Sequence, residues 1–194
     1  MSTLIGPFRQ ILTLKNTDLK GVLNDDSLDI IENGSVLCEG EEIIEVGSFN
    51  ALLSKADQIY EIESDQILMP GLIDCHTHLV WGGTRARDYA LRMSGESYET
   101  ILEQGGGIFD SVAKTRAAEK KELLSSLVRR ANRHLQDGIT TIEVKSGYGL
   151  DVENELKILE VVKEGNSQLK ADLIPTCLAA VSYTHLTLPT TPYV

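Results

Sequence analysis

The stretch "LMPGLIDCHTHLVWGG", residues 68–83, places two histidines one residue apart directly after an apolar run. The run is typical of a buried strand, and side chains alternate along a strand, so we expect Asp74, His76 and His78 to share one face. Two neutral imidazoles at this spacing can bind one divalent metal ion, with Asp74 orienting one ring or the ion. The alternative is a pair of hydrogen-bonded structural histidines, because the pattern H-x-H is common by itself. The apolar run before the pair favours the metal site, since it provides a rigid platform.

Strand and helix patterns alternate after this stretch. Apolar strands are predicted at "GITTIEVK" (138–145) and "ADLIPTCL" (171–178), and helices over 119–136 and 151–164. Such alternation is typical of βα units on a parallel sheet, so the predicted fold class is α/β. In parallel α/β barrels the carboxyl ends of the strands carry the active site. The two histidines fall at this end of their strand.

Each of the two helices is predicted to pack through one apolar face. The first helix ends before Gly138, and its aliphatic side chains share one face: Leu123, Leu124, Leu127, Val128, Ala131 and Leu135. The second helix begins at Asp151, a favourable N-cap residue. It is expected to bury Val152, Leu156, Leu159 and Val162, or their neighbours.

The chain divides into three regions by pattern. Residues 1–66 contain short β-rich pieces separated by Asn, Asp and Gly, which indicate a small β domain. Residues 67–180 carry the alternating strands and helices. Residues 181–194 lack charged side chains, and four threonines and two prolines crowd into the last 11 positions. We interpret this last segment as foreign to the rest of the chain, and we exclude its His185 as a metal ligand.

Composition and charge limit the class of partner. With 42% hydrophobic and 24% charged residues the chain has globular character, which excludes disordered and fibrous classes. A formal charge of -11 disfavours nucleic acid and anionic membranes, so neither is expected as a partner. The start of the chain resembles neither a signal peptide nor a transit peptide, and a cytoplasmic location is expected. Three widely spaced cysteines are expected to be reduced and mostly buried.

Several motifs together resemble a known family. "MPGLIDCHTHL" (69–79) is similar to the P-G-x-x-D-x-H-x-H signature of the amidohydrolase superfamily. Within it, "HTHLVWGGTRARDY" (76–89), "SYETILEQGGGIFDSVAKTRAA" (97–118) and "TTIEVKSGYGL" (140–150) resemble the imidazolonepropionase family. The resemblance implies a small β-sandwich-like domain followed by about the first three units of a (β/α)8 barrel.

The resemblance also implies a reaction and residue roles. The family uses one Zn or Fe ion to hydrolyse the cyclic amide of 4-imidazolone-5-propanoate to N-formimidoyl-L-glutamate in histidine degradation. His76 and His78 correspond to metal ligands, Arg85 to the residue that binds the substrate carboxylate, and Tyr98 and Tyr148 to tyrosines of the substrate pocket. Without the resemblance, a surface ion pair would be the simpler interpretation of the arginine.

The resemblance further implies that this length of chain is incomplete as an enzyme. No catalytic base is identifiable in it; the base and the remaining ligands are expected beyond residue 180, and a family histidine would fall at Val181. We therefore expect the chain alone to be inactive. The alternatives are another amidohydrolase acting on a cyclic amide or amidine, or a non-catalytic metal-binding fragment. The expected partner is a small anionic substrate, and a homodimer of the complete protein is left open.

Overall fold

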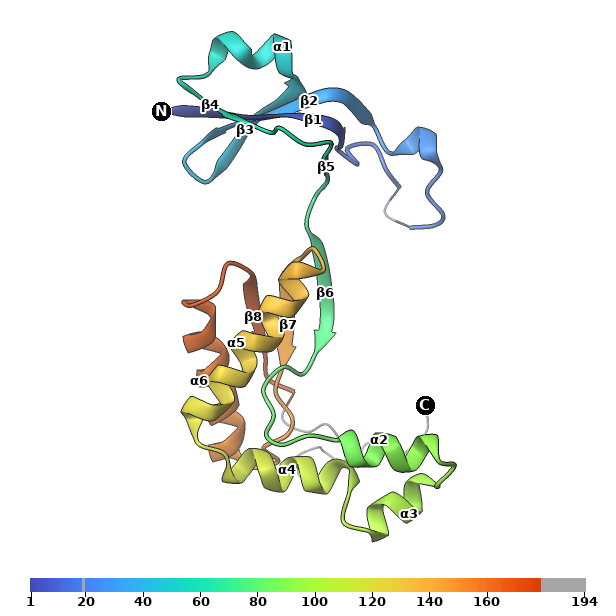
Figure 1. Cartoon of the computed structure of the whole chain (residues 1–194). Coiled ribbons are helices and arrows are strands. Elements are labelled where there is room, and N and C mark those ends of the chain that lie inside the picture. Colours follow the sequence, from blue (N-terminus) through green and yellow to red (C-terminus); the bar gives the residue numbers. More distant parts are fainter. Residues whose placement is uncertain (19, 179–194) are drawn as a thin grey trace. The chain divides into compact units, whose positions relative to one another are not determined.

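The computed structural model describes residues 1–18 and 20–178, and the chain divides into two compact units, Met1–Pro70 and Gly71–Val194 (Figure 1). Each unit has its own sheet. The interpretation of residues 181–194 as foreign, and the expectations for Val181 and His185, lie outside the described residues.

The first unit is a sheet built around one long strand, β1 (Ser2–Leu12). This strand pairs antiparallel with β2 (Ile30–Glu39), which pairs antiparallel with β3 (Glu42–Ser48). On its other side β1 pairs parallel with β4 (Gln58–Glu61) and β5 (Ile67–Leu68). The short helical segments of this unit are η1 (Asp25–Ser27), α1 (Phe49–Leu52) and η2 (Leu53–Lys55).

Two small apolar clusters stabilise the first unit. Their buried members are Leu4, Leu37 and Leu52 in one cluster, and Phe8, Ile11 and Val36 in the other. The β-rich pieces noted in the sequence correspond to β1, β2 and β3 of this sheet, although the strands end a residue or two earlier or begin later than the pieces. Ile67 and Leu68 pair with β1, whereas the sequence pattern joined them to the strand that carries the histidines. The apolar run is therefore not one strand: Pro70 and Gly71 lie between β5 and the histidine strand, and these two strands belong to different sheets.

The second unit is mixed α/β. Its parallel sheet has the order β6 (Leu72–Thr77), β7 (Ile139–Lys145) and β8 (Asp172–Thr176). Between the first two strands lie α2 (Ala86–Met93), α3 (Tyr98–Glu103), α4 (Gly107–Ala117) and α5 (Lys120–Gln136), and α6 (Val152–Asn166) joins β7 to β8. The three strands form an open sheet in the described part of the chain. The α/β prediction and the two βα crossovers are therefore present, without a closed barrel.

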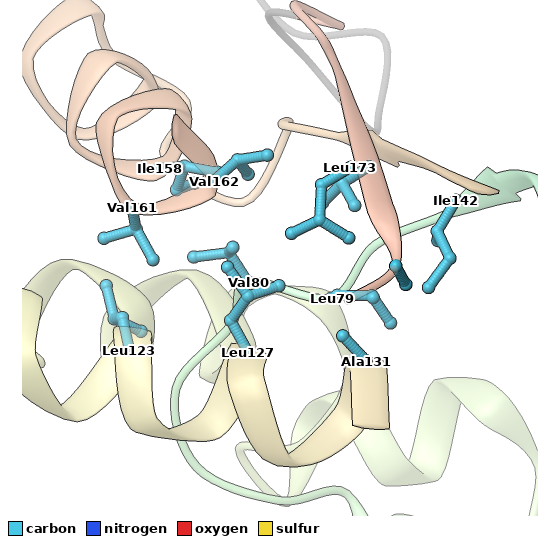
Figure 2. Packing of buried hydrophobic residues seen from close by; sticks show 12 residues of the cluster. Leu79, Val80, Leu123, Leu127, Ala131, Ile142, Ile158, Val161, Val162 and Leu173 are labelled. Atoms are coloured by element: carbon cyan, nitrogen blue, oxygen red, sulfur yellow. The ribbon is translucent and has the colours of Figure 1, made fainter. Parts of the chain in front are cut away.

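The core of this unit lies where α5 and α6 pack on the sheet. Figure 2 shows Leu123 and Leu127 of α5 facing Val161 and Val162 of α6. Ala131 of α5 belongs to the same buried cluster. Ile142 of β7 and Leu173 of β8 complete the buried cluster together with Leu79, Val80, Val144, Ile158 and Ala171. Within residues 1–18 and 20–178 no helix is long and apolar enough to cross a membrane.

The buried face of α6 agrees only in part with the expected one: Val162 is buried as expected, and Val152 and Leu156 are not. Val152 and Leu156 are 68% and 53% exposed, while Ile158, Val161 and Val162 are fully buried. Both sets of residues obey helical spacing, so periodicity alone did not distinguish them. Contacts made by other residues of α6, described below, decide how the helix is rotated.

The cysteine prediction is also corrected. Cys38 is half-buried, but Cys75 and Cys177 are exposed. Cys75 lies on β6, and Cys177 follows β8; these are the two edge strands of the three-stranded sheet. An edge strand has a neighbouring strand on one side only, so its side chains are less covered.

Candidate active site

A register irregularity in β6 determines how the histidine strand presents its side chains. Asp74 pairs with Ile142, and Thr77 pairs with Val144, so a step of three residues on β6 opposes a step of two on β7. This is the pattern of a β-bulge, which inserts one unpaired residue and re-aims the side chains around it. Because Ile142 and Val144 belong to the core under the helices, Asp74 and Thr77 lie on that same helix-covered face.

The bulge separates Asp74 from the two imidazoles. The Asp74 Oδ2 atom lies 3.8 Å from Nε2 of His134 on α5, and Oδ1 accepts a hydrogen bond from the backbone N–H of His76 at 3.2 Å. The prediction that Asp74 shares a face with His76 and His78 is therefore wrong. Strict alternation assumes an unbroken ladder, and the extra residue breaks it.

The two histidines meet at the carboxyl end of β6. The ring centroids of His76 and His78 are 5.8 Å apart, with their planes at 70°. Nδ1 of His78 lies 3.2 Å from the carbonyl oxygen of Lys145. A carbonyl oxygen can only accept, so Nδ1 carries the proton and Nε2 presents its lone pair. Burial lowers the pKa of His78, which favours the neutral ring that a metal ion requires.

The chemistry of the donor set fits part of a metal site. Two imidazole nitrogens supply half of a tetrahedral coordination shell. Among residues 1–18 and 20–178, no group of three or more His, Cys, Asp or Glu side chains is placed to hold an ion. The carboxylate of Glu143 on the neighbouring strand is already bound by protein side chains. Its Oε1 forms an ion pair with Nζ of Lys145 at 2.6 Å and accepts a hydrogen bond from Oγ1 of Thr176 at 2.7 Å. The hydrogen bond from Lys145 is the main cause that lowers the pKa of Glu143.

A small cavity adjoins the histidine pair. Trp81, Arg85, Ser111 and Tyr148 line a cavity of about 220 Å³. Nε of Arg85 donates to Oγ of Ser111 at 2.8 Å, and the guanidinium carbon lies 5.9 Å from the ring centroid of Tyr148. The Tyr148 ring also lies 5.3 Å from the ring of His78, edge to face. Tyr148 therefore links the guanidinium cavity to the imidazole pair.

Three separate segments bring these side chains together. Arg85 is the residue before α2, Ser111 lies in α4, and Tyr148 lies in the loop between β7 and α6. The surface ion pair considered for Arg85 is not seen among the described residues, because Asp88 instead accepts from the N–H of Gly107 at 2.8 Å. The structure thus places His76, His78, Arg85 and Tyr148 in one region.

Of the three residues predicted to bind the substrate, Tyr98 is the one that does not line this cavity. It is the first residue of α3, and 47% of it is exposed. A Cβ added at Gly107 would lie 3.3 Å from its hydroxyl, so the phenol lies near the start of α4. A role for Tyr98 in the substrate pocket stays a prediction.

Sequence reasoning missed Ser111 and Trp81. Ser111 is 4% exposed, and the buried Thr115 lies one helical turn further along α4, donating from Oγ1 to the Ser111 carbonyl at 2.7 Å. Ser and Thr usually favour helix caps and turns, so two hydroxyl residues four positions apart inside a helix were the available signal for Ser111. Thr115 Oγ1 also accepts from the N–H of Gly82 at 3.0 Å, which ties α4 to the segment after the histidines.

Comparisons with known sequences identify homologues. No family model matches the chain. It is 42% identical over 168 residues to the imidazolonepropionase of Idiomarina loihiensis, covering 86% of this chain and 41% of that protein. It is 38% identical over 185 residues to that of Alkaliphilus metalliredigens, covering 93% of this chain and 44% of the relative. The chain is homologous to imidazolonepropionases over most of its length, which confirms the resemblance, and it spans about two fifths of these relatives.

Comparisons with solved structures support the fold. A triazine hydrolase from Arthobacter aurescens matches with a TM-score of 0.61 at 18% identity, covering 91% of this chain and 35% of that one. The guanine deaminase of E. coli matches with a TM-score of 0.59 at 14% identity, covering 90% and 36%. An atrazine chlorohydrolase from Arthrobacter aurescens, complexed with zinc and atraton, matches with a TM-score of 0.50 at 19% identity, covering 89% and 35%. At these identities the likeness establishes the fold alone.

Proposed function

We propose that this homologue of the imidazolonepropionases supplies the histidine pair and the carboxylate pocket of a metal-dependent hydrolase. The proposed reaction opens the cyclic amide of 4-imidazolone-5-propanoate and gives N-formimidoyl-L-glutamate. The observation that carries the proposal is that the Tyr148 ring contacts both the His78 ring and the Arg85 guanidinium. These contacts place a cationic cavity beside the two imidazoles. The homology to imidazolonepropionases supports the choice of substrate.

Arg85 is oriented to bind a carboxylate. Its Nε is held by Ser111, and within residues 1–18 and 20–178 neither Nη atom has a hydrogen-bond partner. The two Nη groups can therefore bind both oxygens of a propanoate with charge-assisted hydrogen bonds. Tyr148 and Trp81 provide aromatic walls on which the planar five-membered ring can pack.

His76 and His78 would hold the Zn or Fe ion at the carboxyl end of β6. When bound, the ion would supply Lewis-acid activation of water and of the ring carbonyl. The chain's own residues contribute a neutral His78 ring with Nε2 available, and a Tyr148 ring that restricts solvent beside it. We assign no general base among the described residues; we propose that it comes, with the other ligands, from sequence that the homologues have in addition.

The test uses a chimera in which residues 1–178 replace the aligned segment of the Idiomarina loihiensis relative. We expect the chimera to consume 4-imidazolone-5-propanoate, measured by loss of its absorbance. Arg85→Ala should lower kcat/KM about 10- to 100-fold, corresponding to roughly 1.5–3 kcal/mol for a lost charge-assisted contact. Arg87→Ala is the matched control, because Arg87 contacts Gln104 on the surface.

Two results would contradict the proposal. A folded chimera with full metal content and no turnover would favour the non-catalytic metal-binding alternative. Turnover of guanine or a triazine in place of the imidazolone would favour the alternative amidohydrolase that acts on a cyclic amidine.

The metal ligands are tested in the same chimera. In the double variant His76→Ala, His78→Ala we expect loss of the bound metal, measured by mass spectrometry. Full occupancy in that variant would remove the ligand assignment.

A further inference from the structure

We propose that Glu155 of α6 is a positioning residue that holds Tyr148 against His78 and Arg85; the inference rests on the function proposed above for that site. Glu155 is 5% exposed, so its carboxylate is almost fully removed from solvent. It lies in the first turn of α6 and does not line the cavity itself. Its effect on the site has to pass through the loop that carries Tyr148.

The Glu155 carboxylate is bound entirely by that loop. Oε2 accepts from the N–H of Gly147 at 2.7 Å, and Oε1 accepts from the N–H groups of Gly149 at 2.7 Å and Leu150 at 2.8 Å. Burying a carboxylate is costly unless its oxygens are hydrogen-bonded, and three N–H donors meet that requirement. Since the three donors lie on both sides of Tyr148, the carboxylate fixes the backbone before and after it.

The loop backbone adopts a conformation that needs such support. Gly147 has φ of +127°, and Leu150, which is not a glycine, has φ of +55°. A leucine in the left-handed region is strained and persists when surrounding contacts over-determine it. A Cβ at Gly149 would lie 2.5 Å from the backbone N of Glu155, so the loop and the start of α6 are in direct contact.

A second contact holds the same loop from the other side. Nε of Arg116, in α4, donates to the carbonyl oxygen of Gly149 at 2.6 Å, and its Nη2 lies 3.2 Å from Oδ2 of Asp151. The helix α4 also carries Ser111, the partner of Arg85. Glu155 and Arg116 therefore hold the N–H and C=O groups of one loop and couple it to the helix that orients the guanidinium.

The substitution Glu155→Gln tests the carboxylate with little change in shape. An amide has one acceptor oxygen, and its NH2 would face an N–H donor of the loop, so at most two of the three hydrogen bonds remain. Glu153→Gln is the matched control, because Glu153 is exposed in the same first turn and its loss removes the same charge. Arg116→Gln is a second variant, since its side chain is 41% exposed and its loss threatens folding less.

The experiment is NMR on the full chain, which needs no turnover. In the wild type we expect a nuclear Overhauser effect between the rings of Tyr148 and His78, and slow amide exchange at Gly147, Gly149 and Leu150. Glu155→Gln should abolish the ring contact and accelerate the three amides at least about tenfold, with core amides of α5 unchanged. Arg116→Gln should weaken the ring contact, and the control should change neither.

The ligand arm uses 3-(imidazol-4-yl)propanoate, titrated by NMR or by the fluorescence of Trp81, the single tryptophan. Glu155→Gln should weaken its binding about tenfold, and the control should not. Unchanged amide exchange at the loop, or equal acceleration of loop and core amides, would overturn the positioning role. If the wild type does not bind the probe, the proposed function fails while the exchange arm still decides whether Glu155 fixes the loop.

Discussion

The contact between α5 and α6 gives a sharp test of the fold. Leu127 of α5 is fully buried, and a Cβ added at Gly165 of α6 would lie 2.6 Å from its Cδ2. Carbon atoms do not approach that closely, so Gly165→Ala has to displace Leu127 or separate the helices. We expect a loss of about 1–3 kcal/mol from overpacking, offset by up to about 1 kcal/mol of helix propensity. Leu127→Ala should cost about 2–5 kcal/mol, because it removes a buried side chain and leaves a cavity.

The double variant distinguishes a specific contact from general damage. In the Leu127→Ala background the atom that clashes is absent, so the alanine at 165 enters the cavity and its helix propensity remains. The double variant should therefore lose about 1–3 kcal/mol less free energy of unfolding than the sum of the two single losses. Such a coupling is typical of residues in direct contact. The assay is urea unfolding of the full chain, followed by circular dichroism.

Leu156→Ala combined with Gly165→Ala is the matched control. Leu156 lies on the same helix but is 53% exposed, so these two effects should add within about 0.5 kcal/mol. Additive effects of Leu127→Ala and Gly165→Ala would refute the packing described for α5 and α6. Equal coupling in the control pair would do the same, because it would show that coupling does not depend on contact.

Two further predictions concern caps and cation contacts. Asp151→Ala should lower the free energy of unfolding by about 1 kcal/mol, because Asp151 caps α6. The cap hydrogen bond lowers the pKa of Asp151. The stabilisation by Asp151 is therefore present above about pH 4, and it is lost as the pH falls through the folded pKa. Asp151→Asn should keep the cap and lose only the contribution of Asp151 to the acid sensitivity, measured as a smaller difference between the free energies of urea unfolding at pH 7 and pH 3. Arg130→Met should cost about 1–3 kcal/mol and change the emission of Trp81, because the guanidinium lies 3.6 Å from that ring centroid and donates to two backbone carbonyls. Arg129→Met, on an exposed side chain, should change neither.

Local patterns predicted the elements that carry the site. The helix expected over 119–136 is α5, and the one expected over 151–164 is α6, because strong periodicity and caps act over short distances. The histidine pair was found from its motif, and the structure places it at the carboxyl end of a parallel strand. Periodicity and motifs of this kind are visible in one segment at a time.

Contacts between segments far apart in sequence could not be predicted in the same way. The face on which Asp74 lies depends on a bulge, which is a property of the β6–β7 pair and not of β6 alone. The pairing of Ser111 with Arg85 spans 26 positions, and no short pattern predicts it. The motif that resembles the family located Arg85 and Tyr148, but it did not reveal what holds them.

The rotation of α6 shows why part of its buried face was missed. Positions 155, 158, 162 and 165 have helical spacing, as do the expected positions 152, 156, 159 and 162. A hydrophobicity argument prefers the second set, because the first includes Glu155 and Gly165. The first set is buried because the glycine-rich loop before α6 supplies three N–H donors to the carboxylate, and because the missing side chain at 165 admits Leu127. The same rotation of α6 therefore closes the helical core and fixes the loop of Tyr148, so core packing and the proposed substrate cavity are coupled through one helix.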